Sequence, residues 1–454
     1  DYITSAKSLR FSKNRKAVVG IEEYNQGKAD KISGLEVIDD STMKIHLKEI
    51  TPSVYWGGNF AGEFVNAKQF EGVAMDKIIE SPALRKNPLS YGPYYIKEVI
   101  QGEKVIFEAN PYFYKGEPKI KRIEMEILPP SQQVAAIKSG KYDLVFMAST
   151  DIFPEIEKFD NINIATRKAN YMNYIAFKLG KWDAEKNENI VNPNAKMYDI
   201  NLRKAIAYAI DNDAIGEQFF HGLASTAKSQ LSPSFPSLHN PDINGYRIDI
   251  EKAKKLLDDA GYKDVDGDGI REGKDGKPIK FTFAMMSGGE TAEPISQYYL
   301  QQWKSIGLNV ELVDGRLLDF NNFYDRVEAD DPAIDFCLAG IGFSSDPQQV
   351  SLFGKTAGFN ISRYTSDTLD AALSATVSPE AMDDQKRIEL YKNYERVFMD
   401  ELPVVPQLNK YEFLPVNKRV KMFDWTESRR GFGTEFDWSQ LELTAPEPIV
   451  DSKN

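Results

Sequence analysis

An acidic stretch near the middle of the chain has residue types and a spacing that could bind a metal ion. It consists of residues 264–275, Asp-Val-Asp-Gly-Asp-Gly-Ile-Arg-Glu-Gly-Lys-Asp. Asp264, Asp266 and Asp268 alternate and a glycine follows them, as in the first half of a calcium loop, where several hard oxygen ligands converge on one ion. At the twelfth position Asp275 replaces the usual glutamate with a shorter side chain. The pattern predicts either a structural calcium site or an acidic turn between a helix and a strand.

A second candidate site follows a predicted buried strand. Residues 334–339, Ile-Asp-Phe-Cys-Leu-Ala, are mostly apolar and lead into the turn Gly-Ile-Gly-Phe-Ser-Ser-Asp-Pro. Ligands of open α/β sheets bind beyond the carboxyl ends of the strands, so this turn is expected to contact a ligand. The candidate residues in it are Phe343, Ser344, Ser345 and Asp346.

Two further predicted strands supply side chains for ligand binding. Asn173 and Phe177 lie in one of them, and Asn409 and Tyr411 lie in the other. Because side chains of a strand alternate between its two faces, Gln407 shares a face with Asn409 and Tyr411. We predict that Asn173, Phe177, Asn409 and Tyr411 contact a ligand.

The sequence holds no set of residues typical of a catalytic centre. Its three histidines, His46, His221 and His239, lie far apart, and it has no HExxH motif and no Cys/His cluster. The single cysteine, Cys337, lies in the apolar run of a predicted strand, where a cysteine is usually a small buried hydrophobic residue. The sequence has no GxSxG motif, which would mark a nucleophilic serine, and no GxGxxG motif that begins a predicted helix. These observations favour binding over catalysis, although an enzyme with two dispersed carboxylates would carry no such motif.

Length and charge restrict the class of protein further. The chain has 454 residues, enough for two or three domains. Lys and Arg number 56 and Asp and Glu number 68, so the net charge is −12. Recognition of a nucleic-acid backbone needs a concentrated basic surface, so nucleic acid is not an expected partner. No apolar run is long enough to span a bilayer.

A helix pair in the centre of the chain separates two regions of α/β pattern. Apolar residues recur at helical spacing through 199–220, with a helix-capping joint at Asp211. Strand–helix–strand patterns occupy 119–147 before this pair and 280–313 after it. The run at 223–236, interrupted by two prolines, is typical of a segment that leads from one domain into another. We therefore predict two sheet-based lobes joined by a hinge.

Three stretches match one set of sequence motifs. Residues 203–211, Arg-Lys-Ala-Ile-Ala-Tyr-Ala-Ile-Asp, match R-x-A-[IL]-x-x-A-[IL]-D. Residues 87–96, Asn-Pro-Leu-Ser-Tyr-Gly-Pro-Tyr-Tyr-Ile, match N-P-[VI]-G-[TS]-G-P-Y-x-[LI] except at Leu89-Ser90 and at the next residue, Tyr91. Residues 110–118, Asn-Pro-Tyr-Phe-Tyr-Lys-Gly-Glu-Pro, match N-P-x-Y-[WY]-x-G-x-P except at Phe113. The chain thus resembles, over nearly its whole length, the family 5 extracellular solute-binding proteins, which are oligopeptide, dipeptide and nickel receptors of ABC importers.

The resemblance implies an α/β, two-lobed periplasmic-binding-protein-like fold (type II, cluster C) with an extra subdomain in lobe one. Residues 1–118 would form this accessory subdomain, 119–224 lobe one, and 225–415 lobe two. Residues 416–454 would return to lobe one and end in a polar tail. The stretch that begins at Asp1 resembles a segment well past the family's N-terminus, so the first part of lobe one is expected to be missing from these residues.

The resemblance also implies an extracytoplasmic receptor that binds oligopeptides and delivers them to an ABC importer of the Gram-positive type. Its expected partners are the peptide and the membrane permease subunits. We expect a monomer, held at the cell surface by a lipid on an N-terminal cysteine outside these residues. No cofactor is expected to be required, and structural calcium stays one of the two alternatives for the acidic stretch. The family has an aspartate where Ser344 and Ser345 stand, so a fixed salt bridge to a peptide's amino terminus is not implied. Two alternatives stay open: the same fold with a dipeptide, nickel chelate or sugar as ligand, and a hydrolase with dispersed carboxylates.

Overall fold

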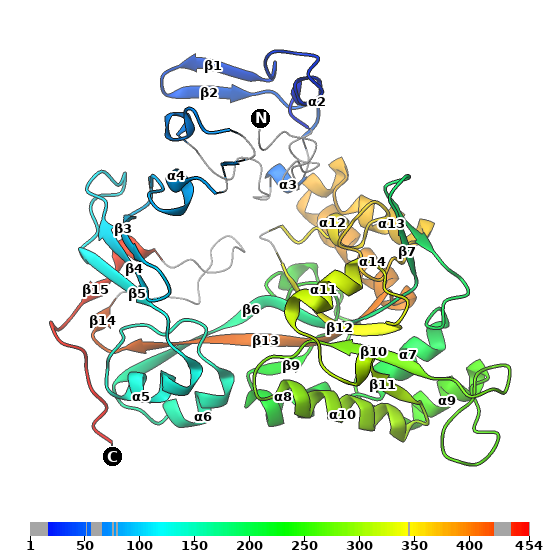
Figure 1. Ribbon diagram of the computed structural model, residues 1–454. Helices are drawn as coiled ribbons and strands as arrows, with labels where there is room; N and C mark the ends of the chain where they lie inside the picture. The colour runs from blue at the N-terminus through cyan, green and yellow to red at the C-terminus, as the bar shows by residue number, and fades with distance from the viewer. Residues whose placement is uncertain are drawn as a thin grey trace. The chain divides into compact units, whose positions relative to one another are not determined.

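The computed structural model divides the chain into two compact units (Figure 1). Unit 1 contains residues 1–167 and 413–454, and unit 2 contains residues 168–412. The polypeptide passes between the units within two strands, β6 (Ile162–Phe177) and β13 (Val404–Asn417). The structure describes residues 17–50, 52–55, 66–74, 77–78, 80–343, 346–421 and 437–453.

Unit 1 contains small antiparallel sheets with short helices beside them. Its described strands pair as β1 with β2, as β3-β4-β5, and as β14 with β15. The elements are α2 (Ile21–Asn25), β1 (Leu35–Asp39), β2 (Thr42–Ile45), α3 (Pro52–Tyr55), α4 (Pro82–Arg85), β3 (Tyr94–Ile100), β4 (Lys104–Ala109), β5 (Arg122–Glu126), α5 (Gln133–Lys138), α6 (Phe153–Ile156), β14 (Val420–Lys421) and β15 (Glu442–Leu443).

The parallel strand–helix–strand unit predicted at 119–147 is wrong in part. β5 and α5 form as predicted, but residues 142–147 are not a strand, and β5 pairs antiparallel with β4. Leu144 makes only an isolated bridge to Val416 of β13. The apolar run at 144–147 does not decide the pairing, because strand pairing depends on tertiary neighbours more than on local propensity.

The last residues of the chain are bonded to unit 1 instead of forming the predicted polar tail. The backbone of Ile449 accepts a hydrogen bond from Asn417 Nδ2 at 2.8 Å and donates one to Asn417 Oδ1 at 3.1 Å. The same carbonyl accepts from the buried side chain of Asn161 at 3.1 Å. The amide of Ser452 donates to Asp160 at 2.9 Å. The carboxyl-terminal segment is therefore part of the unit 1 structure.

Unit 2 is built on a six-stranded sheet with the order β11-β10-β12-β6-β13-β9. β10 is parallel to β11 and β12, which confirms the strand–helix–strand unit predicted at 280–313, and β12 is antiparallel to β6. The remaining elements are β7 (Gly180–Asp183), β8 (Glu188–Val191), α7 (Ile200–Tyr208), α8 (Asn212–Phe220), β9 (Ala224–Thr226), α9 (Ile250–Ala260), β10 (Phe281–Met285), α10 (Ala292–Ser305), β11 (Val310–Leu312), α11 (Phe320–Glu328), β12 (Phe336–Gly342), α12 (Val350–Phe353), α13 (Asp367–Ala375) and α14 (Asp384–Glu401).

Helices cover both faces of this sheet (Figure 1). On one face, Tyr174 of β6 packs in the same core cluster as Phe398 of α14. On the other face, the indole of Trp303 in α10 lies 4.9 Å from the ring of Phe283 and 5.0 Å from that of Phe336. The alternation of side chains along each strand supplies apolar groups to both layers.

The helix pair predicted at 199–220 is confirmed as α7 and α8. Asp199 caps α7 by accepting a hydrogen bond from Asn201 N at 2.8 Å, and Asp211 caps α8 by accepting one from Ala214 N at 2.9 Å. Each cap satisfies an amide that has no partner within the first helical turn.

The unit boundaries differ from the predicted lobe boundaries. Residues 168–224, predicted for lobe one, belong to unit 2, because α7 packs against α9 and α8 packs against β9. The chain returns to unit 1 after Glu412, three residues before the predicted boundary at 415. The helix pair therefore lies inside one unit and does not separate the two.

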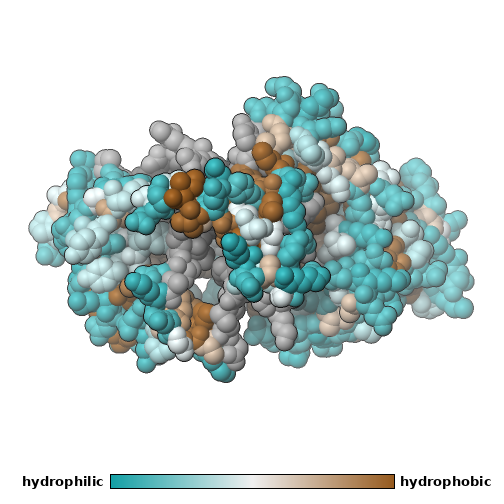
Figure 2. Space-filling model, turned by 90° about the horizontal axis from the view of Figure 1, so that it is seen from above, coloured by the Kyte–Doolittle hydropathy of each residue, from teal (hydrophilic) through white to brown (hydrophobic). Residues whose placement is uncertain are grey.

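Polar residues dominate the surface shown in Figure 2, where hydrophobic residues gather in a few small patches. Among the described residues, none of the helices has both the length and the apolar character that crossing a membrane requires. Burial of apolar area is thus concentrated in the interior of each unit.

Candidate ligand-binding site

The carboxyl ends of the parallel strands β10 and β12 lie at one edge of the unit 2 sheet, where ligands of such sheets bind. β12 ends there with Gly340 and Gly342, which lie directly opposite Asn173 and Tyr171 of β6. Directly opposite residues of an antiparallel pair share a face. Two polar side chains therefore lie beside two glycines at this sheet edge.

Tyr171 occupies the space that a side chain at residue 340 would need. A Cβ added to Gly340 would overlap the hydroxyl of Tyr171, so only glycine allows the ring to lie there. Burial raises the pKa of the Tyr171 hydroxyl to about 12, and a hydrogen bond from the side-chain amide of Asn173 opposes this increase. Tyr171 therefore remains a neutral phenol at physiological pH.

Asn409 and Tyr411 lie on β13, beside β6 in the sheet, and both are half-buried. Gln407 lies on the same face, with its side-chain oxygen 3.5 Å from the hydroxyl of Tyr299 in the aromatic layer of α10. The side-chain oxygen of Asn409 is buried and has no hydrogen-bond partner among the described residues. On this face of β13, Asn409 and Tyr411 thus follow a residue that contacts the aromatic layer.

The turn after β12 only partly matches its prediction. Phe343 is half-buried and packs against the core cluster on the α14 side of the sheet. Asp346 is 6% exposed, and its carboxylate lies 3.9 Å from the guanidinium of Arg387. Asp346 was predicted to face a ligand, but its carboxylate instead makes a buried ionic contact within unit 2. Ser344 and Ser345 lie outside the described residues.

Phe177 is a core residue and does not face a ligand. Its side chain has no exposed area, and its ring lies 6.3 Å from that of Phe336. Phe177 shares a face of β6 with Asn173 but lies deeper in the sheet, under the aromatic layer. The structure describes six of the eight candidate residues. Three of them, Asn173, Asn409 and Tyr411, have partly exposed side chains. Phe177 and Phe343 instead make core contacts.

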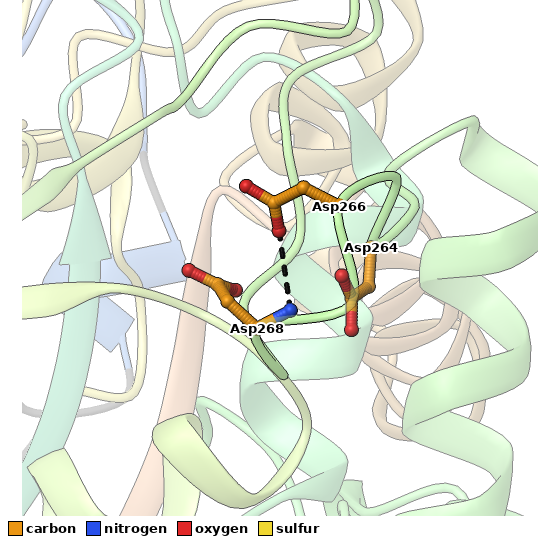
Figure 3. A group of neighbouring side chains, drawn as sticks. All are labelled: Asp264, Asp266 and Asp268. Carbon is orange, nitrogen blue, oxygen red and sulfur yellow. Dashed lines mark hydrogen bonds between the residues drawn. The ribbon is translucent and has the colours of Figure 1, made fainter.

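The acidic loop brings three of its four predicted ligands together. Carboxylate oxygens of Asp264, Asp266 and Asp268 lie within 4.8 Å of one another, and all three side chains are exposed (Figure 3). Asp275 is not part of this group, because its carboxylate accepts a hydrogen bond from the backbone amide of Lys277 at 3.2 Å and pairs with the Lys277 ammonium at 3.4 Å. The oxygen-rich group fits a hard cation such as Ca²⁺ in ligand type.

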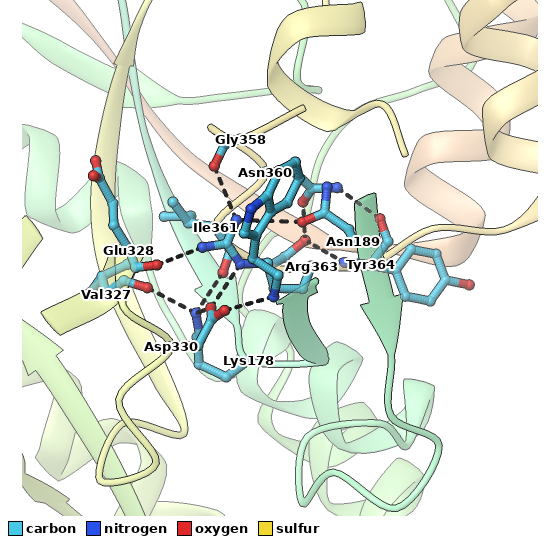
Figure 4. Close-up of polar contacts among 12 residues, drawn as sticks. Lys178, Asn189, Val327, Glu328, Asp330, Gly358, Asn360, Ile361, Arg363 and Tyr364 are labelled. Carbon is cyan, nitrogen blue, oxygen red and sulfur yellow. Dashed lines mark hydrogen bonds and ion pairs between the residues drawn. The ribbon is translucent and has the colours of Figure 1, made fainter. Parts of the chain in front are cut away.

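A buried ionic cluster in unit 2 has no counterpart in the sequence-based prediction (Figure 4). Asp330 Oδ1 accepts hydrogen bonds from Lys178 Nζ at 2.6 Å and from Arg363 Nε at 2.7 Å. The side chains of Lys178 and Arg363 are only 9% and 2% exposed. Burial alone would raise the pKa of Asp330, but the attraction and hydrogen bond of Lys178 and the hydrogen bond of Arg363 hold it below its ordinary value. The one feature of the sequence that could have indicated this cluster is Lys178, a lysine that directly follows the buried apolar strand β6.

Filling the space at Gly340 is expected to destabilise unit 2 by about 1–3 kcal/mol, the usual cost of overpacking. Gly340→Ala would force the Tyr171 ring out of its half-buried position. Thermal unfolding checks this result. Gly358→Ala is the matched control, because a Cβ there meets nothing within 4 Å. If the steric account is right, Tyr171→Ala in the same chain removes most of the loss; equal losses with and without the ring contradict it.

Residues 4–360 match the family model described as "Bacterial extracellular solute-binding proteins, family 5 Middle". The chain is 30% identical over 446 residues to the oligopeptide-binding protein OppA of Lactococcus lactis subsp. lactis. This match spans 96% of this chain and 73% of that protein. It is 26% identical over 400 residues to the oligopeptide-binding protein AppA of Bacillus subtilis (strain 168), with coverages of 85% and 68%. The solved structure of lactococcal OppA complexed with an endogenous peptide in the closed conformation matches with a TM-score of 0.84 and 28% identity, over 97% of this chain and 83% of that chain. This chain therefore belongs to family 5 of the bacterial extracellular solute-binding proteins.

Proposed function

We propose that the protein is an extracytoplasmic receptor that binds oligopeptides and delivers them to an ABC importer. The observation that carries this proposal is the match, over 96% of the chain, to a relative named for oligopeptide binding. The site chemistry supports it, since Tyr171, Asn173 and Asn409 at the sheet edge are all uncharged at neutral pH. Uncharged hydrogen-bonding side chains suit a peptide main chain better than a metal chelate, which a charge-clamped pocket would hold.

We propose that β6 and β13 act as the hinge of this receptor. Both strands carry the chain from one unit to the other, and they are neighbours in the sheet. A ligand that binds the closed state more tightly than the open state shifts the population toward closure. Changes in backbone angles near residues 167 and 412 would allow this motion without breaking the core of either unit.

The partners and location follow from the same proposal. The family is extracellular and binds solutes, so a role as a non-catalytic receptor is the expected one. We propose that the protein is a monomer that docks on membrane permease subunits and is held at the cell surface by a lipid on an N-terminal cysteine. Peptide release to the permease would then need no chemical step in this chain.

The decisive experiment is to identify what the protein retains from its host. The protein is purified from bacteria, denatured in acid, and the released small molecules are analysed by mass spectrometry. Intact peptides of several residues are expected, at lower occupancy in the Gly340→Ala variant, whose displaced Tyr171 disturbs the sheet edge.

The other outcomes separate the alternatives. Peptides that are retained but cleaved on incubation would indicate a hydrolase with dispersed carboxylates. A dipeptide, nickel chelate or sugar in place of longer peptides would indicate another member of the same fold. Either result contradicts an oligopeptide receptor.

We further propose that the loop of Asp264, Asp266 and Asp268 binds a structural calcium ion. The three exposed carboxylates support this, since each offers an oxygen within 4.8 Å of the others. Backbone amides already orient the ligands: Gly267 N donates to Asp264 Oδ1 at 2.7 Å, and Asp268 N donates to Asp266 Oδ1 at 3.1 Å. Bound calcium would link the end of α9 to the segment before β10.

Calcium is expected to raise the melting temperature of the wild-type protein. A ligand that binds only the folded state at 100 times its Kd stabilises by about 2.7 kcal/mol. Melting curves in millimolar CaCl2 and in EDTA measure the shift. Asp266→Asn should abolish it, whereas Asp275→Asn should not, because Asp275 is turned toward Lys277. Identical melting curves with CaCl2 and EDTA in the wild type would contradict the site.

A further inference from the structure

The last described residues of the chain, 446–453, follow a fixed path along unit 1 and are called the strap below. The strap ends beside α5 (Figure 1), where Asp451 N donates to Lys138 O at 3.0 Å. A Cβ added to Gly140, just after this helix, would lie 2.6 Å from the carbonyl oxygen of Ile449. The close approach of the strap to this loop therefore depends on a glycine at residue 140.

The strap is bonded to the unit 1 end of β13. Asn417 is the last residue of this strand and is only 1% exposed. Its Nδ2 donates to the carbonyl of Ile449 at 2.8 Å, and its Oδ1 accepts from the amide of Ile449 at 3.1 Å. Without the strap, this buried Nδ2 group would lose its one acceptor among the described residues, and an unpaired buried donor is costly.

The strap is also bonded to the unit 1 end of β6. Asp160 and Asn161 directly precede this strand. The buried side chain of Asn161 donates to the carbonyl of Ile449 at 3.1 Å, so one carbonyl accepts from side chains at both strand ends. Asp160 accepts from the amide of Ser452 at 2.9 Å and from its hydroxyl, and Asp160 N donates to Asp451 Oδ1 at 2.8 Å.

The two strand ends contact each other directly beside the strap. Lys418 N donates to Asn161 O at 2.9 Å, and Lys418 Nζ donates to Asp160 O at 2.6 Å. The strap thus adds a second connection between the ends of the two strands that cross from unit to unit. Strands joined in this way cannot bend by different amounts at their unit 1 ends without breaking hydrogen bonds.

We propose that the strap is a clamp that holds the unit 1 ends of β6 and β13 together, so that the two strands bend as one at the hinge. This inference rests on the proposed receptor function, in which these strands form the hinge. A clamped hinge has fewer open conformations, so a peptide that binds the closed state meets a lower entropic cost. Asn417 and Asp160 are positioning residues in this account and do not touch the peptide.

Amide hydrogen exchange of the ligand-free protein, read by mass spectrometry, tests the clamp without any peptide. Asn417→Ala removes the bonds of the strap to β13, and Asp160→Ala removes bonds of the strap to the end of β6. Either variant is expected to speed exchange about fivefold at both strand ends, 162–167 and 413–417, because either change breaks the link. The double variant should exchange little faster than the single variants, because the strap is one link.

Ile106→Val, at a buried position of β4 in unit 1, is the matched control. It removes core packing without touching the strap and should leave exchange at both strand ends at the wild-type rate. Asp160→Asn keeps an acceptor for Ser452 N and should restore most of the slow exchange. If circular dichroism shows that Asn417→Ala does not fold, Asp160→Ala, at a half-buried site, carries the test.

Faster exchange confined to the strand that carries the substitution would overturn the clamp, and so would additive effects in the double variant. Calorimetry with a synthetic copy of a peptide retained from the host tests the role in closure. Binding about fivefold weaker is expected in both alanine variants and not in Ile106→Val. Unchanged affinity would overturn the inference while the receptor function stands. If the protein retains no peptide, the proposed function fails, and the exchange rates still decide whether the strap clamps the two strands.

Discussion

Asp330→Asn is expected to lower the free energy of unfolding of unit 2 by about 3–5 kcal/mol, the usual cost of removing one partner of a buried ion pair. Asp330 carries the only carboxylate that the described structure places in contact with Lys178 and Arg363. It also accepts a hydrogen bond from the backbone amide of Trp182 at 2.8 Å. Without the negative charge, two buried cations face each other with only neutral partners, among them Val327 O at 3.0 Å from Lys178 Nζ and the side-chain oxygen of Asn189 at 3.4 Å from the Arg363 guanidinium.

Urea unfolding followed by tryptophan fluorescence measures this loss, since Trp182 lies beside the cluster. Asp325→Asn, at an exposed position of α11, is the control and should change stability by less than about 0.5 kcal/mol. The pKa of Asp330 is lowered in the folded protein, so its contribution is present above its unfolded pKa of about 3.9 and is lost as pH falls through the folded-state pKa. The difference between wild type and variant should therefore shrink in strong acid. A loss below about 1 kcal/mol at neutral pH contradicts this account.

Arg203→Met is expected to cost about 3–4 kcal/mol, because it removes a charged donor group that several buried carbonyls share. The guanidinium is 2% exposed and donates to Leu402 O at 3.1 Å, Glu401 O at 2.9 Å and Met197 O at 3.0 Å. Two of these carbonyls lie at the end of α14, where helix carbonyls have no partner within the helix. Burial lowers the pKa of Arg203 from its ordinary value, yet the carbonyls keep the guanidinium hydrogen-bonded.

Thermal and urea unfolding check this prediction. Arg396→Met is the control, because its i,i+4 ion pair with Asp400 on α14 is more than half exposed and such pairs contribute about 0.3–0.5 kcal/mol. Arg203→Lys should recover only part of the loss, since a single ammonium cannot reach carbonyls on both sides of the planar guanidinium. Equal stability of the Met and Lys variants would show that packing, not hydrogen bonding, explains the effect.

Local signals in the sequence predicted the elements that local chemistry determines. The cap at Asp211 and the strand–helix–strand spacing at 280–313 are confirmed, because a capping side chain and a hydrophobic period act within a few residues. The family resemblance and the periplasmic-binding-protein-like fold are confirmed by the match over residues 4–360 and by the lactococcal structure. Arg203 illustrates the limit of a motif, since its presence was evident but its carbonyl partners were not.

Features that depend on distant partners were not predictable. Asp330 is 152 residues from Lys178 in the sequence, and nothing near either residue indicates the pairing. Phe177 and Asn173 have the same periodicity, yet only the aromatic layer from α10 decides that one is buried and the other lies at the edge. The predicted boundary at 224 failed for the same reason, because contacts from α9 and β9 bring the helix pair into unit 2.

The bonds that hold the carboxyl-terminal segment to unit 1 have a practical consequence for optical experiments. Ile449 and Ser452 are tied to Asn417 and Asp160, so a fluorophore attached at the carboxyl terminus would move with unit 1. A second dye on a cysteine introduced at Asn194 would move with unit 2, while the native cysteine is buried. Resonance energy transfer between the two dyes would then report, in real time, any change in the distance between the two labels when a ligand is added.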